Sequence, residues 1–146
     1  MSMKDSCEVL GKDFERLPGE ITAGSPAEFV EQFKALLDTA PAREYRGIVY
    51  LWLSERPIPR VKGSSKILYI GKTDGCMSDR YRRYVDTVAS GKNWDRYGYV
   101  IKKYGPITFA IKSIVAPQTP KKAEGQLLEE YFKAHLEYPP VNKASS

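Results

Sequence analysis

The fold of this chain is decided by Gly47-Ile48-Val49-Tyr50-Leu51-Trp52 and by Ile67-Leu68-Tyr69-Ile70-Gly71-Lys72-Thr73. Both segments are rich in β-branched and aromatic residues and are bounded by turn formers, which predicts two β-strands. Two prolines and a Gly-Ser-Ser run lie between them and interrupt any continuous element, so we predict a hairpin with a long loop. Each strand carries a tyrosine, and the second strand ends at a glycine and a lysine. This combination suits contact with a phosphate.

The segments on either side of the hairpin show helical or strand periodicity. Upstream, Ser25-Pro26-Ala27-Glu28 supplies an N-cap serine, a first-turn proline and a glutamate, and apolar residues follow at helical spacing up to Pro41. Downstream, the apolar spacing predicts helices over 76–88, 93–105 and 119–138 and a third strand over 107–115.

The predicted order is therefore β-β-α-α-β-α behind one N-terminal helix. This order is typical of an α/β (α+β) fold in which helices flank a small, three-stranded, mainly antiparallel sheet. We assign residues 1–45 to an N-terminal accessory segment with one helix and residues 46–146 to the main domain. The apolar helix at residues 25–40 is expected to cover one face of the sheet.

Composition restricts the classes of protein to consider. The chain has 146 residues and a net charge of +5, which is compatible with an anionic partner but is only a weak pointer to nucleic acid. Cys7 and Cys76 lie far apart, so we expect free thiols in a reducing compartment. His135 is the only histidine and lies in an apolar sector, which favours a core residue and argues against a zinc site. No apolar run approaches ~18 residues, so we expect a cytoplasmic protein without a membrane segment.

Five short motifs follow one another in a fixed order along residues 47–142. They are Tyr69-Ile70-Gly71-Lys72-Thr73, Arg80 with Tyr84 one turn later, Lys103-Tyr104-Gly105 followed by Phe109, Glu129-Glu130-Tyr131-Phe132, and Pro140-Val141-Asn142. Together they resemble the GIY-YIG nucleases, a family that includes phage homing endonucleases, some restriction enzymes and the incision subunit of bacterial nucleotide excision repair. The main domain is therefore expected to be GIY-YIG nuclease-like.

The chain departs from the usual family pattern at two places. The family's first tyrosine stands two residues after the glycine, where this chain has Val49, and Tyr50 comes one residue later. Because strand side chains alternate faces, either the register turns Tyr50 inward or this tyrosine is lost; we expect the former. On the last helix, apolar periodicity singles out Glu124, whereas the family spacing selects Glu129, and we follow the spacing.

The resemblance implies a metal-dependent DNA endonuclease that hydrolyses phosphodiester bonds. It implies one Mg²⁺ (or Mn²⁺) per active site, held largely by Glu129. Tyr50 or Tyr69 would handle the proton of the attacking water, and a nearby cation would have to favour the phenolate, since the reference pKa of tyrosine is ~10. The catalytic residues implied are Tyr50, Tyr69, Lys72, Arg80, Tyr84, Glu129 and Asn142, with Arg80 clamping the phosphate through its planar fork and Asn142 as a structural support.

DNA and a recruiting protein or second copy are the expected partners. Lys62, Arg83, Lys102 and Lys121 are candidates for sequence-independent phosphate contacts. No recognition helix or zinc finger follows the catalytic segment, so we expect low sequence specificity, a homodimer or a recruiting partner. Two alternatives stay open: a catalytically inactive nucleic-acid-binding module of the same fold, motivated by Val49, and a protein-interaction domain that docks through residues 25–40.

Overall fold

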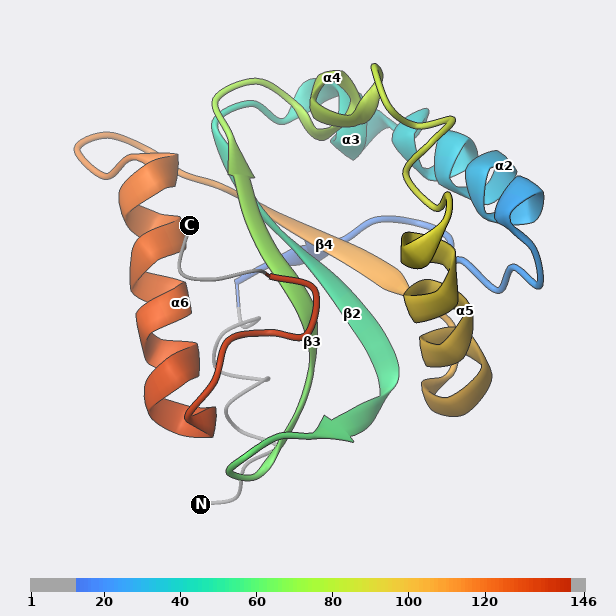
Figure 1. The fold of residues 1–146 in the computed structure, drawn as a ribbon. Helices are drawn as coiled ribbons and strands as arrows, with labels where there is room; N and C mark the ends of the chain where they lie inside the picture. The colour runs from blue at the N-terminus through green and yellow to red at the C-terminus, as the bar shows by residue number, and fades with distance from the viewer. Residues whose placement is uncertain (1–12, 143–146) are drawn as a thin grey trace.

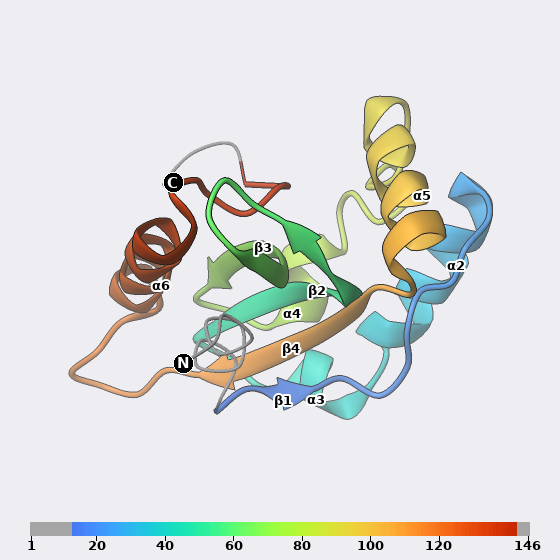
Figure 2. The same cartoon turned by 90° about the horizontal axis from the view of Figure 1, so that it is seen from below.

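The computed structural model describes residues 13–142 and has the predicted α/β class. A four-stranded antiparallel sheet lies between α6 on one face and the remaining helices on the other (Figures 1 and 2). The elements are β1 (Glu15–Arg16), α2 (Pro26–Leu37), α3 (Ala40–Glu44), β2 (Ile48–Pro59), β3 (Ser64–Thr73), α4 (Met77–Tyr81), α5 (Lys92–Tyr104), β4 (Thr108–Ser113) and α6 (Pro120–His135).

The sheet has one strand more than the sequence predicted. Its order is β1-β4-β2-β3, so β2 is central and β3 lies at one edge. The additional strand, β1, pairs with β4 through Glu15↔Ile111 and Arg16↔Ala110. A strand of two residues is too short to show an alternating pattern, which explains why it was missed.

The prediction of a long hairpin loop is wrong. β2 continues to Pro59 and β3 begins at Ser64, so residues 60–63 form the connection. Register shifts on either side of Leu53 interrupt the ladder, and such irregular positions tolerate proline in a strand. The connection is tied to the end of α6, because Lys62 N–H donates to the carbonyl of His135 and the Lys62 carbonyl lies 2.8 Å from the His135 ring Nδ1. His135 is fully buried, as predicted for a core histidine.

The start of α2 agrees with the sequence, but the helix predicted to run up to Pro41 ends at Leu37, and Pro41 lies in the first turn of a second helix, α3, where proline is tolerated. The accessory segment therefore has two helices where one was predicted, and helix boundaries differ again after α4. The Ser25 side chain accepts a hydrogen bond from Glu28 N–H, which confirms the predicted N-cap. The predicted helix over 76–88 is reduced to Met77–Tyr81, and turns occupy 82–89. The Thr87 and Ser90 hydroxyls donate to backbone carbonyls three residues earlier and thus favour turns over continued helix.

Two apolar clusters hold the layers together. Phe29 and Phe33 of α2 pack against Trp52 and Phe109 of the sheet, with Phe33 and Phe109 stacked at 5.3 Å between centroids. The predicted accessory segment and the predicted main domain thus share one core, and the apolar face of α2 is covered rather than free for docking. On the other face, α6 packs against a second cluster: Val49, Leu51, Leu53, Ile67, Ile70, Ala110, Leu128 and Tyr131.

Within residues 13–142, none of the helices combines the length and apolarity needed to cross a bilayer. Cys76 is buried and its sulfur accepts a hydrogen bond from Asp79 N–H at the start of α4. Cys7 lies outside the described residues.

Tyr50 and Gly71 face each other across β2 and β3. A Cβ at position 71 would stand 2.5 Å from Tyr50 Cζ, well inside van der Waals contact. The Tyr50 ring therefore occupies the volume that any other residue would need at position 71, and the two positions constrain each other.

We expect Gly71→Ala to lower the free energy of unfolding by at least about 2 kcal/mol, because the added methyl forces a buried ring to move. Urea denaturation followed by circular dichroism measures the change. The matched control is Gly125→Ala in α6, where nothing lies within 4 Å of the added Cβ and helix propensity gains up to about 1 kcal/mol. Equal stability of Gly71→Ala and wild type would contradict the close approach.

Candidate functional site

The strand register turns Tyr50 toward Tyr69. Tyr50 pairs with Gly71 and Trp52 with Tyr69, and the Tyr50 and Tyr69 ring centroids are 6.0 Å apart. Val49 points to the opposite face, where it belongs to the cluster beneath α6. The one-residue offset in the sequence therefore brings the two phenols onto one face of the sheet.

Tyr50 belongs to a buried hydrogen-bonded chain. Trp52 Nε1–H donates to Tyr81 Oη at 3.1 Å, and Tyr81 Oη donates to Tyr50 Oη at 3.3 Å. Tyr50 is 0% exposed, and burial, reinforced by Tyr69, raises its pKa to about 12. Tyr50 is thus a neutral phenol at pH 7 that supports the site from beneath. Tyr81 lies within the helix predicted over 76–88, and no local pattern in the sequence indicates this bond.

Tyr69 lies at the boundary between the core and solvent, close to Arg80. Its side chain is partly buried; burial raises the pKa of its phenol, and the Arg80 guanidinium acts in the opposite direction. Arg80 lies over the rings of Tyr81 and Tyr84, 5.5 and 5.4 Å from their centroids, and donates to the Tyr84 hydroxyl. Tyr84 is 43% exposed rather than buried, so these two side chains stand at the surface as a pair.

Glu124 is the carboxylate that acts on Tyr69 from α6. It raises the pKa of the Tyr69 phenol, which indicates that the two groups are near each other. Burial raises the pKa of Glu124 itself, and the Lys72 ammonium opposes that shift. Lys72 and Glu124 thus approach the end of β3 from the α6 side, while Tyr69 and Arg80 approach it from the other side.

Glu129 occupies a different part of α6. It lines a hollow of about 540 Å³ together with Gly125, Leu128, Phe132, Lys133 and Tyr138. Five residues correspond to about 140° around a helix, so Glu129 faces away from the direction of Glu124. The metal-binding role of Glu129 stays a prediction from the family spacing, whereas the apolar periodicity pointed to the carboxylate that lies near Tyr69.

Asn142 supports the strand that carries Tyr69. Its Oδ1 accepts from Ile70 N–H and its Nδ2–H donates to the Ile70 carbonyl, both at 3.0 Å. Val141 N–H donates to the Leu68 carbonyl at 2.9 Å, so the C-terminal segment pairs along the outer edge of β3. This geometry agrees with a supporting role rather than with substrate contact.

The predicted DNA-contacting residues lie on four separate elements. Lys62 is on the β2–β3 connection, at the opposite end of the sheet from α4 (Figure 1). Arg83 follows α4, Lys102 ends α5 and Lys121 begins α6. Further cations flank α4: Asp79 pairs with Arg46 at 3.5 Å and with Arg82 at 3.7 Å. The basic groups nearest to Tyr69 are thus those around α4 and the end of β3.

Glu124 is a candidate ligand for a hard divalent cation at the end of β3. Among residues 13–142 there is no group of three or more His, Cys, Asp or Glu side chains that could hold a metal. Magnesium, however, usually keeps several waters and needs only one or two carboxylates. Glu124 is partly buried and its charged form is penalised by that burial, so a bound cation would offset the penalty.

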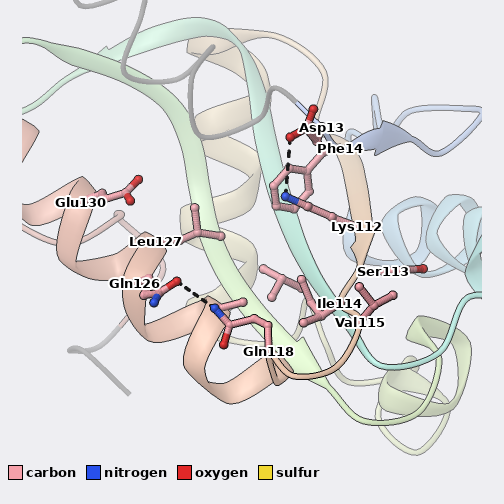
Figure 3. Close-up of a pocket in the computed structure, with 12 residues that line it drawn as sticks. Asp13, Phe14, Lys112, Ser113, Ile114, Val115, Gln118, Gln126, Leu127 and Glu130 are labelled. Atoms are coloured by element: carbon pink, nitrogen blue, oxygen red, sulfur yellow. Dashed lines mark hydrogen bonds and ion pairs between the residues drawn. The ribbon is translucent and has the colours of Figure 1, made fainter.

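A separate hollow of about 340 Å³ lies between β4 and α6 (Figure 3). Lys112 pairs there with Asp13 at 3.7 Å, and Gln118 Nε2–H donates to Gln126 Oε1 at 3.0 Å. Four of its polar side chains are therefore already paired with one another. None of the predicted catalytic residues lines it.

No family model, no curated protein and no solved structure matches this chain. The indications of function are therefore the order of the five sequence motifs and the residues at the end of β3.

We expect the protein to lose stability between pH 10 and 12. The pKa of the Tyr50 phenol is raised to about 12 in the folded state, whereas it is near ~10 in the unfolded chain. The protonated phenol therefore adds to the free energy of unfolding below pH 10, and this stabilisation is lost as the pH rises through 12. In Tyr50→Phe, the loss between pH 9 and 11 is smaller by roughly 1 kcal/mol. Urea denaturation at both pH values measures it.

The control for this experiment is Tyr138→Phe, which removes a partly exposed phenol that packs against the other apolar cluster, away from Tyr50. It is expected to follow the wild-type pH dependence. An identical pH dependence in Tyr50→Phe and wild type would show that the Tyr50 phenol titrates as an exposed one.

Proposed function

We propose that this protein is a divalent-metal-dependent DNA endonuclease that hydrolyses phosphodiester bonds at the end of β3. The observation that carries the proposal is that the Arg80 guanidinium and the Glu124 carboxylate both act on the pKa of the Tyr69 phenol at the end of β3, Glu124 from the α6 face of the sheet, where Lys72 in turn acts on Glu124. A guanidinium can bind the phosphate, a phenol can orient the attacking water, and a carboxylate can hold a metal ion. Phosphodiester hydrolysis needs groups of these kinds around the scissile bond. The resemblance to GIY-YIG nucleases supports the same reaction class.

Arg80 is the group that would bind the phosphate. Its guanidinium is held by ring contacts with Tyr81 and by a hydrogen bond to Tyr84, which reduces the side-chain freedom lost on binding. A planar guanidinium can donate two parallel hydrogen bonds to non-bridging oxygens, and its charge offsets the charge that develops on them. Lys72 adds a second positive charge from the other side of the strand end.

Tyr69 would orient the attacking water. Its phenol is neutral at pH 7, since burial raises its pKa, so its oxygen accepts a hydrogen bond from water rather than removing a proton outright. The water oxygen bonds to phosphorus as the ester P–O bond breaks, and a water proton ends on the departing oxygen. The rings of Tyr50 and Trp52 pack against the Tyr69 ring, with centroids 6.0 and 6.2 Å away.

Glu124 would hold one Mg²⁺ or Mn²⁺, with waters completing the shell of the ion. Such an ion, when bound, supplies positive charge that stabilises the pentacovalent phosphate and the departing oxyanion. Glu129 is the alternative ligand that the family spacing indicates.

A nucleic-acid-binding module without catalysis is the second candidate. The full burial of Tyr50 favours it, because a phenol with no exposed surface cannot touch a substrate. Arg46, Arg80 and Arg82 around α4 would then attract phosphates without cleaving them. This candidate predicts DNA retention that weakens steeply with salt, and no cleavage with any divalent ion.

We expect supercoiled plasmid to be nicked in the presence of Mg²⁺ or Mn²⁺ and to stay intact in EDTA. Glu124→Gln should lower the nicking rate by about a hundredfold, because it removes the carboxylate nearest to Tyr69. Glu129→Gln on the same helix is the matched control and should retain most activity. A loss confined to Glu129→Gln would instead favour the family spacing, and no nicking in wild type would reject the nuclease.

Arg80→Lys should also lower the nicking rate by about a hundredfold, because lysine keeps the charge and loses the planar fork. Arg83→Lys is the matched control: Arg83 is exposed, and a point charge there serves equally well for attracting DNA. Equal rates for the two variants would remove Arg80 from the site.

A further inference from the structure

A hollow on α5 is not used by the site at the end of β3. It has a volume of about 530 Å³ and is lined by α5 and by the segment that precedes α2. Both aromatic and charged side chains line it. The lining residues that matter here are Trp94, Asp95, Gly98, Tyr99 and Lys102.

Trp94 and Tyr99 give this hollow its aromatic surface. A Cβ at Gly98 would stand 3.0 Å from Trp94 Cε2 and Cζ2, so the glycine allows the indole to lie close against the helix. Trp94 is only partly buried, and Tyr99 is 57% exposed. Two aromatic side chains of one helix thus keep accessible surface in the hollow.

The charges around the hollow favour a nucleotide in one orientation. Lys102 lines the hollow, and the Lys103 ammonium lies 5.6 Å from the Tyr99 ring centroid. The Lys103 pKa is raised, chiefly by its hydrogen bond to Tyr99, so this side chain stays charged at pH 7. Asp95 lies inside the hollow and repels a phosphate there. The base of a nucleotide would therefore enter the hollow, and the phosphates on either side of it would lie near Lys102 and Lys103 at the end of α5.

We propose that this hollow binds one unpaired base of a single-stranded DNA segment by stacking. Bases in a duplex are stacked on their neighbours and are not available to an aromatic side chain, whereas those of single strands stack on exposed rings with little sequence preference. The choice of DNA as the ligand rests on the proposed function. Combined with it, the inference makes the substrate a DNA that carries an unpaired stretch.

The hollow is rigidly connected to the proposed active site. Tyr97 of α5 packs between Phe29 and Trp52, with ring centroids 5.2 and 5.3 Å away. Trp52 in turn contacts the Tyr69 ring at 6.2 Å. A DNA single strand that binds to α5 is thus positioned relative to Tyr69 through these packed rings.

The test is the affinity of labelled oligonucleotides, measured by fluorescence anisotropy in EDTA so that cleavage is blocked. The ligands are a dT 12-mer, a 12-base-pair duplex and an rU 12-mer. Trp94→Leu keeps apolar bulk and removes the flat ring, and should weaken dT binding about five- to a hundredfold. Trp94→Phe keeps a ring and should retain most of the affinity. Duplex affinity should be the same in all three proteins.

Equal dT affinity of Trp94→Leu and wild type would overturn the proposal, as would an equal loss in the Leu and Phe variants or a parallel loss for duplex. Ring-dependent binding of the rU 12-mer alone would overturn the assignment to DNA. Ring-dependent binding in a protein that nicks no plasmid would leave this subsite standing and reject only the nuclease.

Discussion

The approach of the Tyr50 ring to the bare Cα of Gly71 is the contact around which the hairpin is built. It fixes the register of β2 against β3, because a slip of one residue would bring a side chain into the ring and send Tyr50 to the α6 face. With the register fixed, Trp52 faces Tyr69, and Tyr81 bonds both Trp52 and Tyr50. The position of Tyr69 at the surface follows from these buried neighbours.

Tyr50 and Tyr69 have different roles because they differ in burial. Tyr50 is enclosed by protein, so its contribution is to packing and to a hydrogen-bonded chain. Tyr69 stands at the boundary, where a guanidinium on one side and a carboxylate on the other act on its pKa in opposite directions. A phenol in such surroundings responds to any ligand that changes the local charge, which is the property a phosphate site requires.

The sequence predicted the parts of the fold that depend on local patterns. The Ser25 cap, the strand pair around Tyr50 and Tyr69, and the start of α6 all follow from capping chemistry and periodicity. The sequence-based prediction was wrong where contacts between distant residues determine the strand and helix boundaries. Register shifts around Leu53 let β2 run through prolines that normally end a strand. The apolar spacing would continue the helix beyond Tyr81, but residues 82–89 form turns.

The candidate site shows the same division. Spacing alone paired Arg80 with Tyr84, since residues four apart share a helix face. The partnership of Tyr81 with Tyr50 joins residues 31 positions apart, and no local pattern encodes such a bond. For α6, apolar periodicity and family spacing gave different carboxylates, and the packing of α6 on the sheet brings the periodic one, Glu124, toward Tyr69.

The pairing of Val141 and Asn142 along β3 has a consequence for self-association. An outermost strand with free backbone groups invites a strand from another molecule to extend the sheet. Here the backbone groups of Leu68 and Ile70 are already bonded to the chain's own C-terminal segment. Copies of this protein therefore cannot merge their sheets at that part of β3, and a second copy would have to associate through another surface.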